Sequence, residues 1–295
     1  MKGGPMKTLI QLTLPPEAKP TSINHCIKQA HISQRMRRKL RSEGLIKVNQ
    51  EEASWNTLLK AGDHLSISLA PSQDLIPYPL PLDIVYEDSY LLVVNKPAGL
   101  LMHPTAKERH KTLANALAYY YQESGQAYDF HPVHRLDKDT SGLVIIAKTA
   151  LVQHAFEKQG LKFQKVYDAI VQGLLPANAC LHWPIARKDG SIIERAVHPS
   201  GKESHTDVQV VAHYNQSYSH VRCLLHTGRT HQIRVHLSYL GYPLLGDDIY
   251  GGPLDRIQRQ ALHARFLTFD HPISGQRIHL EGPLPTDMET LLHES

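Results

Sequence analysis

The 295-residue sequence lacks the features that mark membrane-spanning, secreted and zinc-knuckle proteins. It holds no run of 18 apolar residues, so no segment is expected to cross a bilayer as a helix. Residues 1–7 are not followed by the apolar core of a signal peptide. The three cysteines, Cys26, Cys180 and Cys223, are far apart and predict neither a disulfide framework nor a zinc knuckle. These absences favour a cytoplasmic protein with no membrane partner.

Acidic charge is also scarce at the start of the chain. Residues 1–70 hold 11 Lys+Arg and 5 Asp+Glu, a net charge of +6. Residues 71–295 hold 21 Lys+Arg and 23 Asp+Glu, a net charge of −2. A basic N-terminal part on a near-neutral body predicts that the first part holds a polyanion.

Residues 21–69 have the pattern of a small module. Its expected elements are two helices and two strands, over residues 23–30, 33–44, 45–49 and 64–68. Five residues of the second helix are cationic: Arg35, Arg37, Arg38, Lys39 and Arg41. They form either an ordinary solvated helix face or a row of contacts to phosphates, and the charge balance favours the second interpretation.

A proline-rich segment separates this module from the rest of the chain. Residues 70–82 hold four prolines, which predicts a stiff, extended connector. We therefore expect an N-terminal domain over residues 1–70, a linker over 71–83 and a larger domain over 84–295. With 41% hydrophobic residues, the chain can bury a core in each domain.

The larger domain mixes strands and helices without a regular alternation. Strands are expected over residues 84–86, 90–94, 143–148, 165–173, 206–212 and 219–226. Helices are expected after Thr112 and Thr149, which suit the N-cap position, and after Thr230. This pattern predicts an α+β fold with a largely antiparallel sheet.

The loop 131–142 of this domain is polar and crowded with charge. It carries Asp137 and Asp139 among several bases and leads straight into the apolar strand 143–148. Loops held on a rigid strand are where catalytic residues tend to lie. Taken alone, such a loop is more often an exposed turn with a solvated charge cluster.

Four separated blocks of sequence change that judgement. They are Asn95–Gly99 with His103-Pro104; His134–Asp137 with Thr140–Gly142; Lys165–Tyr167 with Ala169, Val171 and Gly173; and Thr227–Leu237 with Gly246-Asp247 and Tyr250-Gly251. In this order they resemble the RluA-type pseudouridine synthases, over residues 84–285. Glu43–Asn49 and Ala61–Leu65 make the N-terminal module similar to the small RNA-binding domain named after ribosomal protein S-four.

The resemblance implies the pseudouridine synthase fold, a bent mixed or antiparallel sheet flanked by helices with a central cleft. It also implies isomerisation of uridine to pseudouridine in RNA. By the family pattern, Asp137 is the catalytic aspartate, Tyr167 packs against the target base, and Arg229 is the basic partner of Asp137. Asp139 is the rival carboxylate, which would instead bond local N–H groups.

Two further residues of these blocks are expected to contact RNA. Arg135 either fills the gap left by a flipped base or holds a neighbouring phosphate, unless it forms a structural ion pair with Asp139. Lys165 either holds a phosphate or caps the sheet, and the sequence does not separate these roles.

The implied reaction breaks the N1–ribose bond of uridine and forms a C5–ribose bond. It is redox-neutral and transfers no group from outside, so neither a cofactor nor a metal is expected. It needs an ionised carboxylate that attacks the ribose, adds to the ring or removes a ribose proton. An aromatic residue such as Tyr167 offers a face on which uracil stacks.

Two other functions fit parts of the sequence. A metal hydrolase would need converging ligands, but His226, His231 and His236 are five residues apart and no His-Glu-x-x-His run is present. A non-catalytic RNA-binding or ribosome-assembly factor would not need Asp137 and Tyr167. The expected partner is RNA, ribosomal (large subunit) rather than transfer RNA, bound by a monomer with no obligate protein partner.

Overall fold

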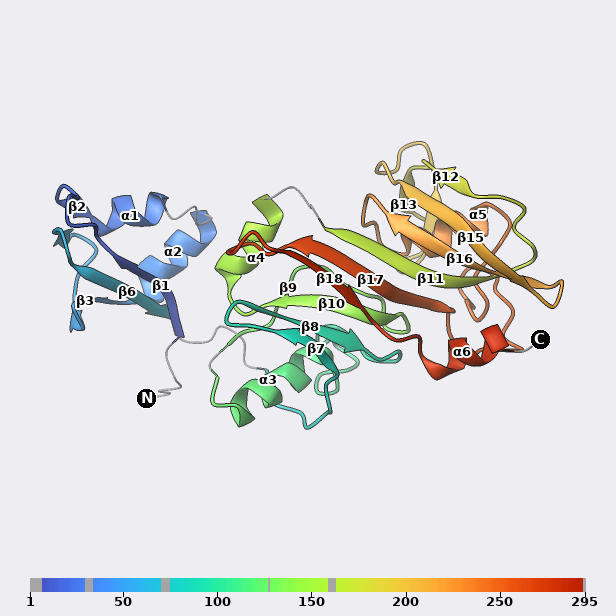
Figure 1. Ribbon diagram of the computed structural model, residues 1–295, viewed down its shortest axis with the longest axis horizontal. Coiled ribbons are helices and arrows are strands. Elements are labelled where there is room, and N and C mark those ends of the chain that lie inside the picture. The colour runs from blue at the N-terminus through green and yellow to red at the C-terminus, as the bar shows by residue number, and fades with distance from the viewer. Residues whose placement is uncertain (1–6, 30–33, 70–74, 127, 159–162, 294–295) are drawn as a thin grey trace.

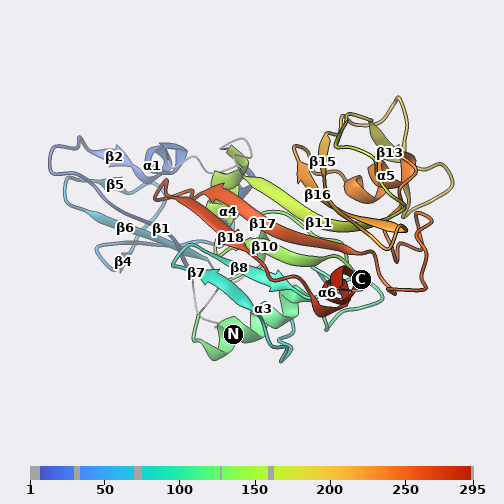
Figure 2. The same cartoon turned by 45° about the vertical axis from the view of Figure 1, so that its right-hand side comes forward.

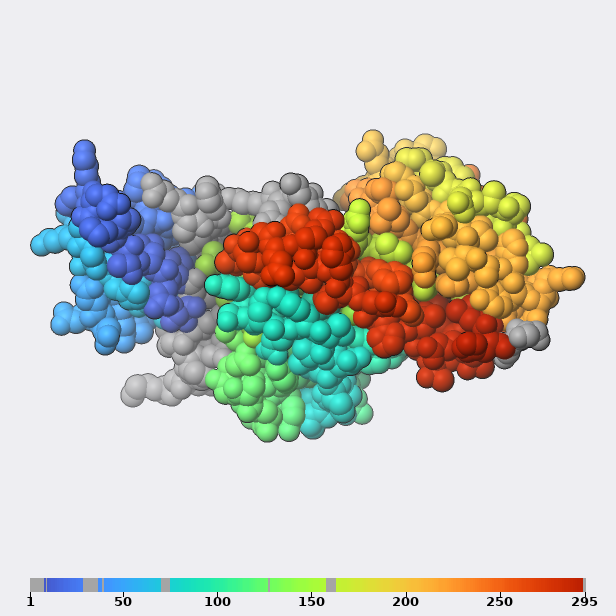
Figure 3. Space-filling view, in the orientation of Figure 1, coloured from blue at the N-terminus to red at the C-terminus, as the bar shows by residue number. Residues whose placement is uncertain are grey.

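The computed structural model describes residues 7–29, 34–69, 75–126, 128–158 and 163–293. The molecule is an elongated row of three lobes, with the N-terminal lobe at one end of the long axis (Figures 1 and 3). The other two lobes share one continuous sheet, which is seen obliquely in Figure 2. In the part of the chain that the structure describes, no helix is long and apolar enough to span a membrane.

The N-terminal lobe is built from two small sheets and two helices. Its four-stranded sheet has the order β1-β6-β3-β4, formed by Lys7–Thr13, His64–Leu69, Leu45–Val48 and Glu51–Glu52. The two-stranded sheet pairs β2 (Thr21–Ser22) with β5 (Leu58–Leu59), and the helices are α1 (Ile23–Gln29) and α2 (Gln34–Glu43). Strand β1 was not expected from the sequence, and the expected helix residues 30 and 33 lie outside the described residues.

This lobe has a hydrophobic core of its own. Ile23 and Ile27 of α1, Leu40 of α2 and Ile67 of β6 are almost fully buried together. Leu151, from the larger part of the chain, packs against this core. Leu80 and Leu82 of the proline-rich segment pack instead against the core of the larger part.

The larger part is organised around a ten-stranded sheet. Its strands follow the order β12-β15-β16-β11-β17-β10-β8-β7, with β18 added beside β17 and β9 beside β10. Their bounds are Ala179–Leu181, Thr206–Tyr214, Tyr218–Leu225, Gln164–Gln172, Leu262–Asp270, Ser141–Ala147, Leu91–Lys96, Ile84–Glu87, Arg277–Glu281 and His131–Pro132. The β10–β17 pair is parallel and the other pairs of this sheet are antiparallel, which confirms the expected fold class.

Among the described residues of the larger part, four helices and a hairpin flank this sheet. They are α3 (Leu113–Glu123), α4 (Ala150–Lys158), α5 (Gln232–Tyr239), α6 (Thr286–His293) and the strands β13 (Ile185–Arg187) and β14 (Arg195–Val197). Thr112 caps α3 by accepting a hydrogen bond from the Asn115 N–H, as its sequence position predicts. Thr149 does the same for α4 through the Val152 N–H.

Strand β10 is buried on both faces, which fixes the position of the loop that precedes it. Val144 and Ile146 join the core that contains α3, whereas Leu143 and Ile145 join the core that contains α4. At its start, Gly142 has a φ of 117° and runs so close to β17 that a Cβ atom there would lie 2.4 Å from the Ala264 carbonyl oxygen. Only glycine suits that conformation and that spacing.

Candidate active site

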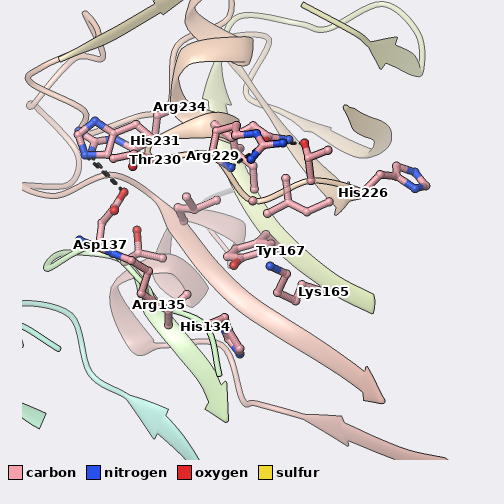
Figure 4. A pocket seen from close by; sticks show the side chains of 18 of the residues that line it. His134, Arg135, Asp137, Lys165, Tyr167, His226, Arg229, Thr230, His231 and Arg234 are labelled. Carbon is pink, nitrogen blue, oxygen red and sulfur yellow. Dashed lines mark hydrogen bonds and ion pairs between the residues drawn. The ribbon is translucent and has the colours of Figure 1, made fainter. Parts of the chain in front are cut away.

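The loop 131–142 opens into a cavity of about 410 Å³. One wall is this loop, the floor is β11, and the opposite wall is the segment from Leu225 to Arg234 that leads into α5 (Figure 4). Five sequence-predicted residues line the cavity: Asp137, Tyr167, Arg229, Arg135 and Lys165. The structure therefore brings together residues that lie up to 94 positions apart in the sequence, from Arg135 to Arg229.

Asp137 faces two basic side chains across the cavity. Its carboxylate lies 3.5 Å from Nη1 of Arg234 and 3.8 Å from Nε2 of His231. The Asp137 side chain is 22% exposed, so it is reachable from the cavity but largely removed from bulk water. The carboxylate is thus partly enclosed and lies beside an opposite charge.

Arg234 is fixed in place by a second carboxylate. Its Nε and Nη2 atoms donate to the two oxygens of Asp247 at 2.7 and 2.8 Å, and both side chains are buried. Burial opposes the charge of Arg234, but Asp247 more than offsets this and raises the pKa of the guanidinium. The planar fork leaves Nη1 for Asp137, so the geometry of Asp247 sets the direction of the cation.

The expected pairing of Asp137 with Arg229 is therefore corrected to a pairing with Arg234. Arg229 is exposed on the opposite wall, and its Nε donates to the Glu203 carbonyl at 3.0 Å. Both arginines belong to one sequence block, but helix α5 begins between them. His231, the residue before the helix, has a left-handed backbone conformation, and the helix starts at Gln232. Arg234 thereby faces inward and Arg229 stays at the rim.

Tyr167 forms the floor of the cavity. It is buried on β11, and burial, with the nearby charge of Asp137, raises the pKa of its hydroxyl. A neutral phenol ring that lines the cavity suits stacking of a nucleobase. Tyr167, expected from the sequence to pack against the target base, thus lines the cavity.

Lys165 and His134 occupy the end of the cavity away from Asp137 (Figure 4). Burial lowers the pKa of Lys165 to about 8. Burial, and then the charge of Lys165, lowers the pKa of His134 well below its usual value. Nε2 of His134 accepts the Ile145 N–H at 3.3 Å, so the neutral ring carries its proton on Nδ1, for which the described residues provide no acceptor. This end of the cavity thus carries one lysine cation beside a neutral imidazole.

The Asp137 loop is held from behind by Lys96. The Lys96 ammonium is buried and donates to the carbonyl oxygens of Pro97, Leu100 and Lys138 at 2.8–3.0 Å. Burial lowers the pKa of Lys96 to about 7, although the charges of Asp139 and Asp137 oppose that shift. Asp139 does not line the cavity, whereas Asp137 does. The structure therefore distinguishes the two acids, which their positions in the sequence alone did not.

The predicted RNA-binding helix lies outside this cavity. Arg38 and Arg41 of α2 are exposed, and Arg41 donates to Asn24 at 2.6 Å while its guanidinium carbon lies 5.9 Å from the Trp55 ring centre. Arg37 is partly buried. The side chains of Arg35 and Lys39 lie outside the described residues.

The histidines considered for a metal hydrolase do not converge. His236 is buried and hydrogen-bonded to Trp183 and Thr206, His231 contacts Tyr250 at 2.8 Å, and His226 lies with Asp207. Arg234, His231, Asp247 and Tyr250 were missed as site residues. The available signal was an arginine within the apolar helix pattern 233–240 and an aspartate 13 positions later.

Comparison with protein families gives two matches. Residues 90–239 match the RNA pseudouridylate synthase family. Residues 10–65 match the N-terminal domain of the RluD ribosomal pseudouridine synthases. The first match contains all five predicted residues that line the cavity, and the second contains the cationic helix α2.

Individual proteins agree with these matches. The chain is 42% identical to the uncharacterised RNA pseudouridine synthase YhcT of Bacillus subtilis, over 83% of both chains. It is 42% identical to the ribosomal large subunit pseudouridine synthase D of Pseudomonas aeruginosa, over 72% of this chain and 71% of that protein. The solved structure of human RNA pseudouridylate synthase domain containing 1 superposes with a TM-score of 0.58 at 28% identity, over 69% of this chain and 83% of that one. The chain therefore belongs to the RNA pseudouridylate synthase family and is an isomerase that converts uridine in RNA to pseudouridine.

Proposed function

We propose that Asp137 is the essential catalytic residue and that large-subunit ribosomal RNA is the substrate. The observation that carries the first part is the position of the Asp137 carboxylate, opposite Arg234 and beside the buried ring of Tyr167 in one cavity. Asp139, the other acid of the loop, does not line that cavity.

In the proposed reaction, uracil enters the cavity as a flipped base and stacks on Tyr167. Asp137 acts on the nucleotide while the N1–C1′ bond breaks, the base turns, and a C5–C1′ bond forms. The proton on C5 is then lost and N1 gains one, so atoms and electrons balance without an outside reagent. Arg234 pairs with the Asp137 carboxylate and holds it in the cavity, Lys165 or Arg229 holds a phosphate, and Arg135 occupies the gap in the RNA.

The substrate proposal rests on the relatives and on the N-terminal lobe. Several similar proteins are named ribosomal large subunit pseudouridine synthases D, and the module matching their N-terminal domain carries exposed Arg38 and Arg41. We propose residues 1–70 as an RNA-binding domain, 71–83 as a linker and 84–295 as the catalytic domain of a monomeric enzyme. An enzyme acting on ribosomal RNA would work in the cytoplasm.

The assignment of Asp137 is tested with two matched variants. Asp137→Asn should form no measurable pseudouridine in ribosomal RNA transcripts, whereas Asp139→Asn should keep most of the activity, because only Asp137 reaches the cavity. Melting temperatures and RNA affinity should stay near those of the wild type in both variants. An active Asp137→Asn enzyme would refute the assignment.

The substrate is tested by mapping pseudouridines in total RNA from cells with and without the gene. We expect sites to disappear from large-subunit ribosomal RNA in the deletion and to return with the wild-type gene but not with Asp137→Asn. Loss confined to transfer RNA would refute the ribosomal proposal and leave the assignment of Asp137 intact.

A further inference from the structure

Tyr250 contacts both basic partners of Asp137 from outside the cavity. Its hydroxyl oxygen lies 2.8 Å from Nδ1 of His231, and the guanidinium carbon of Arg234 lies 5.0 Å from the centre of its ring. Among the described residues, His231 and Arg234 line the cavity and Tyr250 does not. Any effect of Tyr250 on the reaction must therefore pass through these two side chains.

The backbone of Tyr250 is anchored by the carboxylate that also fixes Arg234. The Tyr250 N–H donates to Oδ1 of Asp247 at 3.3 Å, and Nη2 of Arg234 donates to the same oxygen at 2.8 Å. The Tyr250 carbonyl accepts the Ser238 hydroxyl of α5 at 2.8 Å. The phenol ring and the guanidinium that lies over it are thus held by one acid, which fixes their relative position.

The backbone of His231 directs its imidazole away from the helix that it precedes. His231 has a φ of 58° and a ψ of 21°, a left-handed conformation that is uncommon in residues other than glycine. Its side chain makes no capping hydrogen bond to α5. Instead, Nδ1 contacts the Tyr250 hydroxyl, and Nε2 lies 3.8 Å from Oδ2 of Asp137 (Figure 4). The two ring nitrogens therefore have different neighbours.

The hydrogen bonds around Tyr250 indicate which nitrogen of His231 carries the proton. The Arg195 N–H donates to the Tyr250 oxygen at 2.9 Å, so the phenol directs its own proton to Nδ1 of His231. With Nδ1 as the acceptor, the neutral imidazole carries its proton on Nε2. An Nε2–H that faces the Asp137 carboxylate is attracted to it, whereas a lone pair there would be repelled. Both ends of the ring favour the same tautomer.

His231 and Arg234 offer Asp137 two different kinds of donor. Burial lowers the pKa of the His231 imidazole, and the charge of Asp137 only partly opposes this, so the ring is a neutral donor. Burial also raises the pKa of the Tyr250 hydroxyl, which therefore keeps the proton that it donates. Arg234 supplies the positive charge, and the nearest oxygen to both groups is Oδ2 of Asp137.

From these contacts we propose that Tyr250 and His231 are positioning residues for Asp137. The Tyr250 hydroxyl selects the His231 tautomer whose Nε2–H faces Oδ2 of the carboxylate, and the Tyr250 ring keeps Arg234 beside the same oxygen. Because both groups face Oδ2, Asp137 turns Oδ1 toward the nucleotide. This inference rests on the proposed catalytic role of Asp137, but the tautomer of His231 is measurable without any reaction.

Nitrogen NMR of full-length protein, isotope-labelled in its histidine rings, tests the tautomer. The His231 signals, assigned by correlating ring and backbone nuclei, should show a protonated Nε2 and an unprotonated Nδ1 in the wild type at neutral pH. Tyr250→Phe keeps the ring near Arg234 but removes the hydroxyl, so its His231 should populate both tautomers. A wild-type ring protonated on Nδ1, or an unchanged tautomer in Tyr250→Phe, would overturn the proposal.

Single-turnover pseudouridine formation tests the consequence for Asp137. Tyr250→Phe should lower the rate about 5–10-fold, the effect of about one neutral hydrogen bond. Its RNA affinity should stay near that of the wild type, because Tyr250 does not line the cavity. Tyr239→Phe, which removes the hydroxyl of an exposed tyrosine at the end of α5, is the matched control and should react as the wild type does.

Two substitutions of His231 separate a donor from a packing group. His231→Gln restores a neutral N–H donor and should react faster than His231→Phe, which fills the space without one. Equal rates in these two folded variants, or a wild-type rate in Tyr250→Phe, would overturn the positioning role. Failure of the Asp137 assignment itself would appear separately, as activity in Asp137→Asn.

Discussion

The positive charges of the N-terminal lobe and those of the catalytic cavity are held in opposite ways. Arg38 and Arg41 project from α2 into solvent, where they act over long range and are screened by salt. Arg234 is buried in the larger part, Lys165 is half-buried there, and Arg234 is fixed by two hydrogen bonds to Asp247. The comparison teaches that the exposed arginines of α2 suit the capture of RNA, whereas the basic residues of the cavity suit action on one nucleotide.

The largest expected effect is that of removing the buried cation. Arg234→Gln should lower kcat by about 10²–10³-fold, because an electrostatic partner fixed beside the reacting group is lost. Arg229→Gln should have a smaller effect on kcat, since Arg229 contacts Glu203 rather than Asp137. Single-turnover pseudouridine formation measures both variants.

Folding must be separated from chemistry in that comparison. Arg234→Gln leaves Asp247 buried without its ion-pair partner, which itself destabilises proteins. Arg234→Gln/Asp247→Asn replaces the ion pair with neutral groups, so it should recover stability without recovering activity. A double variant with wild-type kcat would contradict the proposed role of Arg234.

Next in size is the loss of the lysine behind the catalytic loop. Lys96→Met should lower the free energy of unfolding by about 3 kcal/mol or more, because three carbonyl groups, one of them fully buried, lose a charged donor. Lys138→Met removes an exposed side chain of the same loop and should change it by less than about 0.5 kcal/mol. Urea denaturation gives both values, and equal effects would show that Lys96 does not hold the loop.

A smaller effect is expected from titrating Lys165. Its pKa of about 8 means that it is charged at lower pH and neutral at higher pH, so RNA affinity should fall as the pH rises from 7 to 9. Lys165→Arg stays charged throughout this pH range, so its RNA affinity should not depend on pH. Lys165→Gln is neutral throughout, so its affinity should also be independent of pH and should be weaker than that of the wild type at pH 7. Fluorescence anisotropy with inactive Asp137→Asn protein isolates binding, and an unchanged profile in Lys165→Arg would remove Lys165 from the phosphate contacts.

The smallest change per residue is expected on the N-terminal lobe. Arg38→Gln and Arg41→Gln should each reduce the slope of log affinity against log salt by about 0.7–0.9, with kcat unchanged. Arg277→Gln removes an equal charge that is already paired with Asp270, and it should leave the slope nearly as it was. A drop in kcat with an unchanged slope would reverse the roles assigned to the two regions.

Local patterns in the sequence predicted much of this structure. Thr112 and Thr149 begin their helices, and Tyr167, Ala169 and Val171 share a buried face of β11, as expected. These features depend on neighbouring residues and on hydrophobic periodicity, which the sequence displays directly.

Features that depend on strand register or long-range pairing were not predictable in this way. The choice between Arg229 and Arg234 depends on where α5 begins and on a partner, Asp247, that is contributed by a later loop. The contact between Asp207 and His226 depends on how the start of β15 pairs with the end of β16, which His226 directly follows. Spacing along the chain carries neither piece of information.

A substitution at Gly142 would inactivate the enzyme without removing any charged group. A methyl group there would press against the backbone of β17, and β17 also pairs with the strand that carries Tyr167. Forcing β10 and β17 apart would change the distance between the Asp137 carboxylate and the Tyr167 ring by about the diameter of one atom. Gly142→Ala would thus abolish the activity of the enzyme although all of its reactive side chains are still present.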